Sequence, residues 1–478
     1  METRAVEDAA VLRPDLCVIG AGPGGLVVAA GAAQMGASVV LVERGRMGGD
    51  CLNTGCVPSK STIAAARLAE AMRRAGPFGI DPVEPAVDYE AVQAHVRSVI
   101  EAIATHDSVE RFEALGVRVV RGEARFAGPA VVIAGGVRIH ARRFVIATGS
   151  SPAVPAVPGL ADVPFLTSDD VFESRSRPDR LVVLGGGPIG VELAQAYRRL
   201  GCAVTLLEQG TILPREDPDA VAVVRAALTA EGVTIREGAA VRRIEAAPAG
   251  VRVIAAGGEV VEGTHLLVAT GRRPNVEALG LDAAGVRFDA RGIETDRRLR
   301  TSNRRIYAIG DVTGRAAFTH VAGHHAGIVI RNALFRLPAR IEARAVPRVV
   351  FCDPELAQVG MDEREARAAG LEPVVSRAPF AENDRARADR ATAGFVKVVS
   401  DRRGRVLGAT IVGAAAGELI LPWVLAVRDR MRLSSIAGAI VPYPTLSDAS
   451  RAAAGTFYAP RLYGPAVRRL VRFLARFG

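Results

Sequence analysis

The stretch Gly20-Ala21-Gly22-Pro23-Gly24-Gly25 follows a short apolar segment at residues 15–20 and opens a helical pattern over residues 26–35. A second apolar segment, residues 38–42, ends at Glu43. Glycines at this spacing allow a tight turn and a close approach of the backbone to a pyrophosphate, whose negative charge is stabilised by the helix N-terminus. An acidic residue after the second strand accepts hydrogen bonds from ribose hydroxyls. The complete unit predicts a dinucleotide-binding βαβ fold.

A second unit of the same kind begins at residue 181. Its strand, residues 181–184, is followed by Gly185-Gly186-Gly187-Pro188-Ile189-Gly190, a helix to residue 200 and a strand over residues 203–207 that ends at Glu208. Two such units imply two dinucleotides and an α/β protein. A carboxylate at Glu208 would accept a ribose 2′-hydroxyl and repel a 2′-phosphate, which favours NADH over NADPH for a nicotinamide cofactor at this site. Arg215 is close enough in sequence to approach a phosphate, so NADPH is not excluded.

Between residues 48 and 60 the chain reads Gly48-Gly49-Asp50-Cys51-Leu52-Asn53-Thr54-Gly55-Cys56-Val57-Pro58-Ser59-Lys60. The glycines let the backbone bend so that the two sulfurs can approach bonding distance. Asp50 has the residue type of a helix N-cap, and a helix dipole lowers the pKa of thiols in its first turn. The carboxylate of Asp50 acts the other way and raises the pKa of Cys51. The segment predicts a redox-active dithiol, and the alternative is two small buried cysteines of a core helix.

The remaining elements follow from periodicity and from proline content. Apolar positions at helical spacing predict one packing helix over residues 89–115. The other predicted strands are 117–121, 130–140, 144–147, 348–351, 394–399 and 406–412. Five prolines within residues 150–178 predict a linker and a domain boundary.

Composition limits the class of protein. The 478 residues allow about three domains, and a 49% hydrophobic content is ordinary for a globular chain. No apolar run has membrane-spanning length and no signal core precedes residue 15, so we expect a cytoplasmic protein. The five cysteines are too few and odd in number for a secreted disulfide framework. The net charge is +10, but the arginines are scattered, which disfavours a nucleic-acid partner.

From about residue 15 to about residue 454 the sequence resembles the class I pyridine nucleotide-disulfide oxidoreductases, the family of dihydrolipoamide dehydrogenase, glutathione reductase and mercuric reductase. The resemblance implies two Rossmann-like domains arranged as in glutathione reductase, a C-terminal α+β dimerisation domain and a homodimer. It implies FAD at the first glycine motif and the nicotinamide cofactor at the second. Cys51 would then exchange with the substrate and Cys56 would contact the flavin. Lys60 would lie near the flavin and pair with Glu192.

The same resemblance assigns the cofactor-binding residues and the domain boundaries. The assigned residues are Gly20, Gly22, Gly25, Glu43, Thr148, Gly149, Gly185, Gly187, Gly190, Glu208, Gly271, Gly310, Asp311 and His320. The expected domains are 1–150 and 272–343 for FAD, 151–271 for NAD(P)H, 344–460 for dimerisation and 461–478 for a basic amphipathic tail. We expect this tail either to contact an acidic membrane surface or to pack on its own dimer.

The segment Tyr443-Pro444-Thr445-Leu446-Ser447-Asp448 departs from the family pattern. Most disulfide-reducing members carry histidine, the acid/base for the dithiol, where Tyr443 stands, and a glutamate that holds it where Asp448 stands. A tyrosine with a pKa near 10 is ionised in about one molecule in a thousand at pH 7, so it is a poor base. Mercuric reductases also carry tyrosine here, and soft thiolate ligands suit metal reduction. No cysteine pair follows in the C-terminal residues to hand a metal over.

These observations predict an FAD-dependent NAD(P)H:disulfide oxidoreductase that resembles dihydrolipoamide dehydrogenase and passes electrons from NADH through FAD and the Cys51–Cys56 disulfide to a small-molecule or protein disulfide. The alternative is reduction of Hg(II) at the same dithiol, with Tyr443 in place of the histidine. A third hypothesis is a non-catalytic flavoprotein that docks to a membrane or a partner through its tail. No resident metal site is expected.

Overall fold

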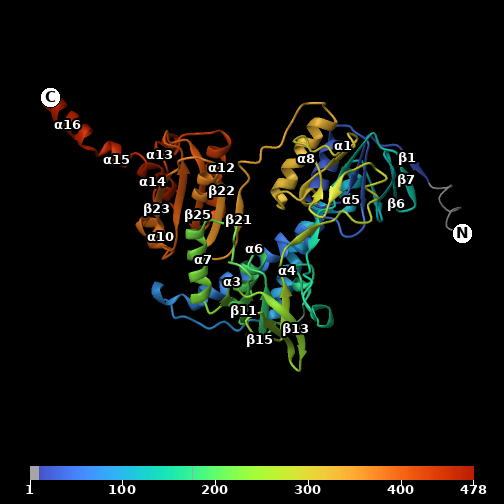
Figure 1. The fold of residues 1–478 in the computed structure, drawn as a ribbon, viewed down its shortest axis with the longest axis horizontal. Coiled ribbons are helices and arrows are strands. Elements are labelled where there is room, and N and C mark those ends of the chain that lie inside the picture. Colours follow the sequence, from blue (N-terminus) through green and yellow to red (C-terminus); the bar gives the residue numbers. More distant parts are fainter. Residues whose placement is uncertain (1–9, 175, 478) are drawn as a thin grey trace. The chain divides into compact units, whose positions relative to one another are not determined.

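The computed structural model describes residues 10–174 and 176–477 (Figure 1). Internal contacts divide the chain into two units: unit 1 is Met1–Leu184, Arg242–Val253 and Glu262–Ile341, and unit 2 is Gly185–Val241, Ile254–Val261 and Glu342–Gly478. This division is coarser than the five predicted segments, whose boundaries stay predictions. No helix among the described residues is both long and apolar enough to cross a bilayer.

Unit 1 is built on a five-stranded parallel sheet in the order β20-β8-β2-β3-β4. Its strands are β2 (Leu16–Ile19), β3 (Val39–Glu43), β4 (Val117–Arg121), β8 (Arg143–Ile146) and β20 (Ile306–Ala308). Leu16 and Val18 belong to a core with α1 (Pro23–Gln34) and α8 (Thr319–Ala333), which lie side by side in Figure 1. Successive strand residues point to opposite faces, and Cys17 and Ile19 accordingly belong to a second core.

A smaller sheet in the order β1-β7-β6-β5 packs on that second core. Its strands are β1 (Val11–Leu12), β5 (Arg125–Gly128), β6 (Val131–Ala134) and β7 (Val137–Ile139). The single strand predicted over residues 130–140 is therefore wrong. Gly135 and Gly136 both have positive φ, at 53° and 74°, which is the conformation that a two-residue hairpin turn requires.

The single helix predicted over residues 89–115 is also wrong. The structure has α4 (Tyr89–Ala104), a 3₁₀ turn η2 (Thr105–Asp107) and α5 (Val109–Ala114). The break lies at Ser108, whose side chain accepts a hydrogen bond from the backbone N–H of Arg111 and so caps α5. Helix α4 packs against α3 (Cys56–Arg73), which follows the short helix α2 (Gly49–Asn53).

The rest of unit 1 consists of short pairings. The predicted linker contains β9 (Ser150–Pro152), which pairs antiparallel with β17 (Arg272–Pro274). Strand β10 (Arg180–Leu184) pairs parallel with β16 (His265–Val268), and β18 (Phe288–Asp289) pairs with β19 (Gly292–Ile293). The remaining elements in this part of the chain are η1 (Gly76–Phe78), η3 (Leu160–Asp162), η4 (Val171–Glu173), β13 (Val241–Ala247), β14 (Gly250–Ala255), β15 (Val260–Gly263) and η5 (Gly310–Thr313).

Unit 2 combines the second glycine motif with the C-terminal region. Strands β11 (Ala203–Leu207) and β12 (Thr234–Arg236) pair in parallel, and α6 (Pro188–Arg199) packs on β11. Helix α7 (Pro218–Ala230) contacts the C-terminal antiparallel sheet, whose order is β21-β22-β25-β24-β23. These strands are β21 (Arg348–Val350), β22 (Glu355–Gly360), β23 (Val374–Pro379), β24 (Phe395–Ser400) and β25 (Val406–Gly413).

Small helices cover this sheet around the fully buried Trp423, whose indole N–H donates to Ser450. They are α9 (Glu363–Ala368), η6 (Phe380–Glu382), α10 (Asp384–Ala388), α11 (Ala416–Leu419), α12 (Leu421–Arg428), α13 (Leu433–Ala437) and α14 (Asp448–Thr456). Lys397 of β24 is buried and lies 2.9 Å from the carboxylate of Asp217 and 2.8 Å from that of Asp219. This ion triad connects the start of α7 to the C-terminal sheet. The chain continues into α15 (Ala459–Leu462) and α16 (Pro465–Leu474).

Candidate active site

The two cysteines come from two consecutive helices. Cys51 is the third residue of α2, and Cys56 is the first residue of α3; both are free thiols. The segment that carries them lies against the first glycine loop. The N–H of Gly48 donates to the carbonyl of Ala21 at 2.9 Å, and a Cβ at Gly49 would lie 2.6 Å from the Cα of Gly22. Only glycine permits this approach, which brings the dithiol to the predicted FAD loop.

The prediction that Asp50 is a helix N-cap is wrong. Gly48 holds the N-cap position of α2 in a left-handed conformation, and Asp50 lies inside the helix. Its carboxylate accepts a hydrogen bond from the hydroxyl of Thr54 at 2.6 Å and lies 2.8 Å from the guanidinium of Arg272. The helix begins earlier than expected because the glycine pair can adopt the positive φ values of 88° and 60°. The Asp50 side chain is thereby directed to a cation.

The two thiols have opposite electrostatic environments. The hydrogen bond from the Cys51 thiol is the largest influence that lowers the pKa of Cys56, to about 6, and the hydroxyl of Thr319 and the charge of Lys60 act in the same direction. The same hydrogen bond raises the pKa of Cys51, as do burial and the Asp50 charge. The expected effect of Asp50 on Cys51 is therefore present. Cys56 is the favoured thiolate, and the assignment of the two thiols to flavin and substrate stays a prediction.

Arg272 connects the dithiol segment to a second acidic residue. Its Nε donates to the hydroxyl of Ser150 at 2.8 Å, and that hydroxyl donates to Asp311 at 2.7 Å. Burial raises the pKa of Asp311, and burial together with the Asp50 charge raises that of Asp169. Arg272, Ser150 and Thr319 were not among the predicted site residues. Arg272 directly follows Gly271, a predicted cofactor-binding residue, and this adjacency in the sequence was a local signal that Arg272 belongs to the site.

The first glycine motif has the geometry expected for a dinucleotide. The Glu43 carboxylate accepts hydrogen bonds from the N–H of Ala21 at 2.6 Å and from that of Gly45 at 2.7 Å. Gly22 caps α1 without a side-chain acceptor, which leaves the first helical N–H groups for an anion. A Cβ at Gly25 would lie 1.9 Å from the carbonyl oxygen of Gly20, so the turn requires glycine. The chain's residues therefore fit the adenosine and pyrophosphate portions of FAD.

The second glycine motif repeats this arrangement in unit 2. Glu208 accepts hydrogen bonds from the N–H of Gly186 at 2.7 Å and from that of Gly210 at 2.8 Å. Gly187 caps α6 without a side-chain acceptor, with Gly185 before it and Gly190 within the helix. Glu208 directly follows β11, and its carboxylate lies at the end of this strand. This is the position at which the sequence predicts a contact with a ribose.

The remaining predicted cofactor residues lie on loops of unit 1. The Thr148 hydroxyl donates to the carbonyl of Asn275 at 2.9 Å, and the N–H of Asn275 donates to the carbonyl of Gly149 at 3.0 Å. The carbonyl of Gly271 accepts from the N–H of Ala153 at 2.9 Å. Gly310 and Asp311 begin η5, and the N–H of Gly310 donates to the buried His325 ring at 3.3 Å. Burial lowers the pKa of His325 to about 4, so the ring is neutral and can accept this bond. His320 is exposed and stacks on Phe318.

The last predicted catalytic residues belong to unit 2. Glu192 is buried and accepts a hydrogen bond from the N–H of Phe351 at 2.9 Å. Its pairing with Lys60 of unit 1 stays a prediction. The Tyr443 hydroxyl donates to Asp384 at 3.1 Å, and this hydrogen bond raises the pKa of Tyr443. Asp448, the expected holder of Tyr443, instead pairs with Arg451 at 2.7 Å.

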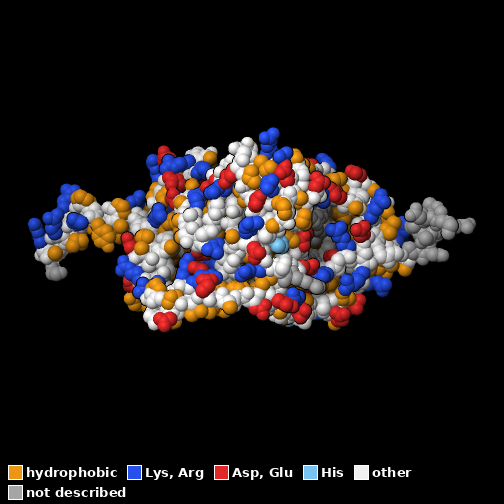
Figure 2. All heavy atoms as spheres, turned by 90° about the horizontal axis from the view of Figure 1, so that it is seen from below, with side chains coloured by type: hydrophobic (Ala, Val, Ile, Leu, Met, Phe, Trp, Pro, Cys, Tyr) orange, Lys and Arg blue, Asp and Glu red, His pale blue; other side chains and the backbone are white. Residues whose placement is uncertain are grey.

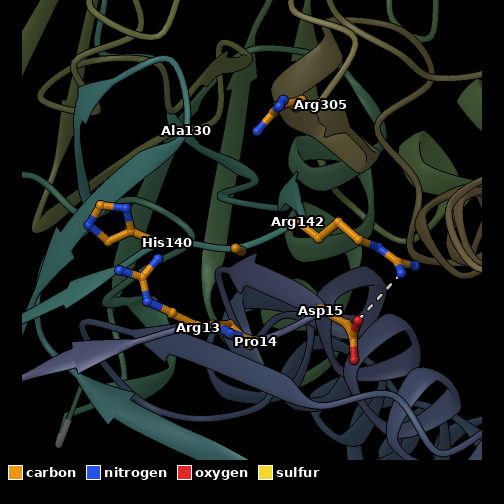
Figure 3. A pocket seen from close by; sticks show the side chains of 8 residues that line it. Arg13, Pro14, Asp15, Ala130, His140, Arg142 and Arg305 are labelled. Atoms are coloured by element: carbon orange, nitrogen blue, oxygen red, sulfur yellow. Dashed lines mark ion pairs between the residues drawn. The ribbon is translucent and has the colours of Figure 1, made fainter.

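A separate hollow of about 390 Å³ lies elsewhere in unit 1 (Figure 3). Its lining residues are Arg13, Pro14, Asp15, Ala130, His140, Ala141, Arg142 and Arg305. Asp15 and Arg142 form an ion pair across it at 3.6 Å. None of the predicted site residues lines it, and its arginines are exposed.

Comparison with known families identifies the class of protein. The pyridine nucleotide-disulphide oxidoreductase family matches residues 14–326, and the dimerisation domain of that family matches residues 346–454. The chain therefore belongs to the pyridine nucleotide-disulphide oxidoreductases, a family of FAD-dependent enzymes that use a pyridine nucleotide. This confirms the predicted family, fold class and enzyme class, and the dimerisation domain supports a homodimer.

Individual relatives differ in substrate. A mercuric reductase of Acidithiobacillus ferrooxidans is 39% identical over 457 residues, which cover 92% of this chain and 82% of the relative. A dihydrolipoyl dehydrogenase of Thermus scotoductus is 38% identical over 455 residues, covering 91% of this chain and 95% of the relative. The Cu(II) complex of the flavoprotein disulfide reductase RclA from Escherichia coli has a TM-score of 0.85 at 28% identity and covers 93% and 99% of the two chains.

Proposed function

We propose that this chain is an NADH-dependent reductase of a thiophilic metal ion, Hg(II) foremost, which binds to Cys51 and Cys56. The observation that carries the proposal is the hydrogen bond from Tyr443 to Asp384. It raises the pKa of a phenol that already keeps its proton at neutral pH, so the residue at the family's base position becomes a still weaker proton acceptor. The sequence alone ranks a disulfide substrate first, and this contact together with the relatives reverses the order.

Disulfide reduction needs the proton relay that Tyr443 does not supply. The Cys51 thiol must lose its proton before it attacks a disulfide, and the departing thiolate of the substrate must gain one. Burial and the neighbouring groups raise the pKa of Cys51, which makes that proton harder to remove. Loss of a general acid–base group typically costs about 10²- to 10⁴-fold in rate.

A soft metal ion removes this requirement. A thiol that coordinates a metal ion is deprotonated by the ion, so Cys51 releases its proton to solvent as it binds, whereas Cys56 binds as the thiolate it already is at neutral pH. The overall reaction is Hg(II) + NADH → Hg(0) + NAD⁺ + H⁺, in which the metal gains the two electrons that NADH loses. When bound, FAD would accept those two electrons from the nicotinamide and pass them to the dithiol site.

The chain's own residues have defined parts in this scheme. Glu43 and the loop at Gly20–Gly25 would hold the adenosine and pyrophosphate of FAD. Thr319 and Lys60 stabilise the Cys56 thiolate. Glu208, held by two backbone N–H groups, accepts the ribose 2′-hydroxyl of NADH and repels a 2′-phosphate, which supports NADH over NADPH.

The relatives support a metal substrate without excluding a disulfide. Several similar chains are named mercuric reductases, at 34–39% identity, and RclA was solved as a Cu(II) complex. The second candidate, reduction of a lipoamide-like disulfide, is favoured by the 38% identity to a dihydrolipoyl dehydrogenase. The family assignment makes the chain an FAD-dependent oxidoreductase, so the hypothesis of a non-catalytic flavoprotein is not retained.

The proposal is tested by anaerobic incubation of the purified protein with NADH and Hg(II) held by excess small thiol. We expect about one elemental mercury atom per NADH oxidised, and no mercury from the C51S/C56S double variant. NADH oxidation that yields no elemental mercury, or a wild-type enzyme that oxidises no NADH with Hg(II), overturns the metal proposal.

A further inference from the structure

Helix α16 (Pro465–Leu474) separates its side chains into two faces. Because an α-helix advances about 100° per residue, Val467, Leu470, Val471 and Leu474 fall on one side. The opposite side of α16 carries Arg468, Arg469 and Arg472. Arg476, two residues beyond the end of the helix, would continue that side. We call residues 461–477 the C-terminal arm.

The apolar face of the arm is uncovered. None of the residues of α16 is buried, and the exposed fractions are 53% for Leu470, 58% for Val471, 54% for Leu474 and 74% for Phe477. Figure 1 shows α15 and α16 running away from the C-terminal sheet of unit 2, and Figure 2 shows blue and orange side chains along the arm. An exposed apolar face is typical of an interaction site, so we expect a partner surface that is apolar where it contacts Leu470 and Leu474.

The charge of the arm identifies that surface as acidic. No aspartate or glutamate follows Asp448 in the sequence, whereas arginines occur at 451, 461, 468, 469, 472 and 476. A second copy of the arm would place arginine against arginine, and the whole chain carries a net charge of +10. The arm also lies beyond residue 454, where the match to the family's dimerisation domain ends. Pairing with another copy is therefore disfavoured.

We propose that the C-terminal arm docks this enzyme on an anionic lipid surface. Phe473 and Phe477, whose rings lie 5.1 Å apart, and the exposed Tyr463 supply aromatic groups that partition into the interfacial region of a bilayer. The arginine stems lie along the headgroups while their guanidinium groups contact lipid phosphates. In a homodimer whose two arms reach the same surface, two weak contacts would combine into a stable one.

The test is flotation of the full-length holoenzyme with vesicles of phosphatidylcholine alone or of phosphatidylcholine with about 30% phosphatidylglycerol. Three variants are compared: R469Q/R472Q on the charged face, L470S/L474S on the apolar face, and R402Q/R403Q, which removes two exposed arginines from a turn of unit 2. NADH oxidation is measured on each sample, because docking is independent of the proposed chemistry.

We expect wild type and R402Q/R403Q to float with the anionic vesicles and not with the neutral ones. R469Q/R472Q should bind about 25-fold more weakly, at about fivefold per charge near an anionic surface. L470S/L474S should bind about tenfold more weakly or worse. Equal flotation of wild type and both arm variants overturns the proposal. So does absence of flotation combined with dimer dissociation when residues 465–478 are deleted, which would assign the arm to the dimer.

Discussion

The Sγ of Cys56 lies 3.6 Å from the Oγ1 of Thr319, the first residue of α8. Cys56 itself begins α3, so the sulfur lies at the N-terminus of one helix and contacts a side chain at the N-terminus of another. Both helix dipoles favour a thiolate there, and the hydroxyl can donate to it. Two segments far apart in the sequence therefore cooperate to select which cysteine is ionised.

Removing the Thr319 hydroxyl should raise the pKa of Cys56. Thr319→Val keeps the shape and loses the donor, so the midpoint of Cys56 ionisation should rise by about one pH unit. The readout is the long-wavelength thiolate-to-flavin absorbance of the two-electron-reduced enzyme as a function of pH. The control is Thr105→Val, whose hydroxyl donates only to its own helix. An unchanged midpoint would mean that Thr319 does not hold the thiolate.

The pH dependence of the same absorbance follows from the lowered pKa of Cys56. A pKa of about 6 instead of the ordinary 9.0 means that the thiolate is present above pH 6 and is lost as the pH falls through that value. Cys51, whose pKa is raised, should stay protonated through neutral pH. Cys56→Ser should abolish the band and Cys51→Ser should retain it. The reverse outcome would exchange the roles of the two thiols.

Neutralising Asp50 should make both thiols more acidic. Its negative charge raises the pKa of Cys51 and of Cys56, so Asp50→Asn should lower both. Because Cys56 is already ionised at pH 7, the effect is sought below its pKa: alkylation of the reduced enzyme by iodoacetamide at about pH 5 should accelerate about two- to fivefold. Asp289→Asn also breaks a carboxylate–arginine pair of unit 1 and serves as the control. Slower alkylation of the Asp50 variant would contradict this account.

Glu208 should determine the preference for NADH. Glu208→Gln retains an acceptor for one of the two backbone N–H groups and removes the charge that repels a 2′-phosphate. We expect the ratio of kcat/KM for NADH to that for NADPH to fall about tenfold or more. A wild-type enzyme that already prefers NADPH would refute the assignment and would direct attention to Arg215.

Lys397 should contribute to the stability of unit 2. Lys397→Met leaves the Asp217 carboxylate, 1% exposed, without its cation, which typically costs about 3–5 kcal/mol. Thermal unfolding should therefore begin several degrees lower. The double variant K397M/D217N removes the stranded charge and should recover part of the loss. No recovery would mean that the lysine stabilises the sheet by packing alone.

The sequence predicts the elements that are set by residues close together in the chain. It misses the contacts between residues that are far apart in the chain. The glycine motifs, their strands and the dithiol are set by residues adjacent in the chain, so their positions follow from the sequence. The pair Gly135–Gly136 is a local turn signal. The prediction followed the apolar pattern of residues 130–140 instead and therefore missed the hairpin. The pair of Asp50 and Arg272 joins α2 to β17, and no local pattern reports such a contact. Tyr443 was identifiable as a departure, but its bond to Asp384 was not.

The central claim is that the dithiol reduces a metal ion rather than a disulfide. The most direct measurement is anaerobic NADH oxidation by one enzyme stock with lipoamide in one cuvette and Hg(II) in excess thiol in another. We predict rapid oxidation with Hg(II), about 10²-fold or more above that with lipoamide, because Tyr443 cannot relay the proton of Cys51. Rapid turnover of lipoamide with an idle mercury cuvette would contradict the claim and would require another proton acceptor beside Cys51.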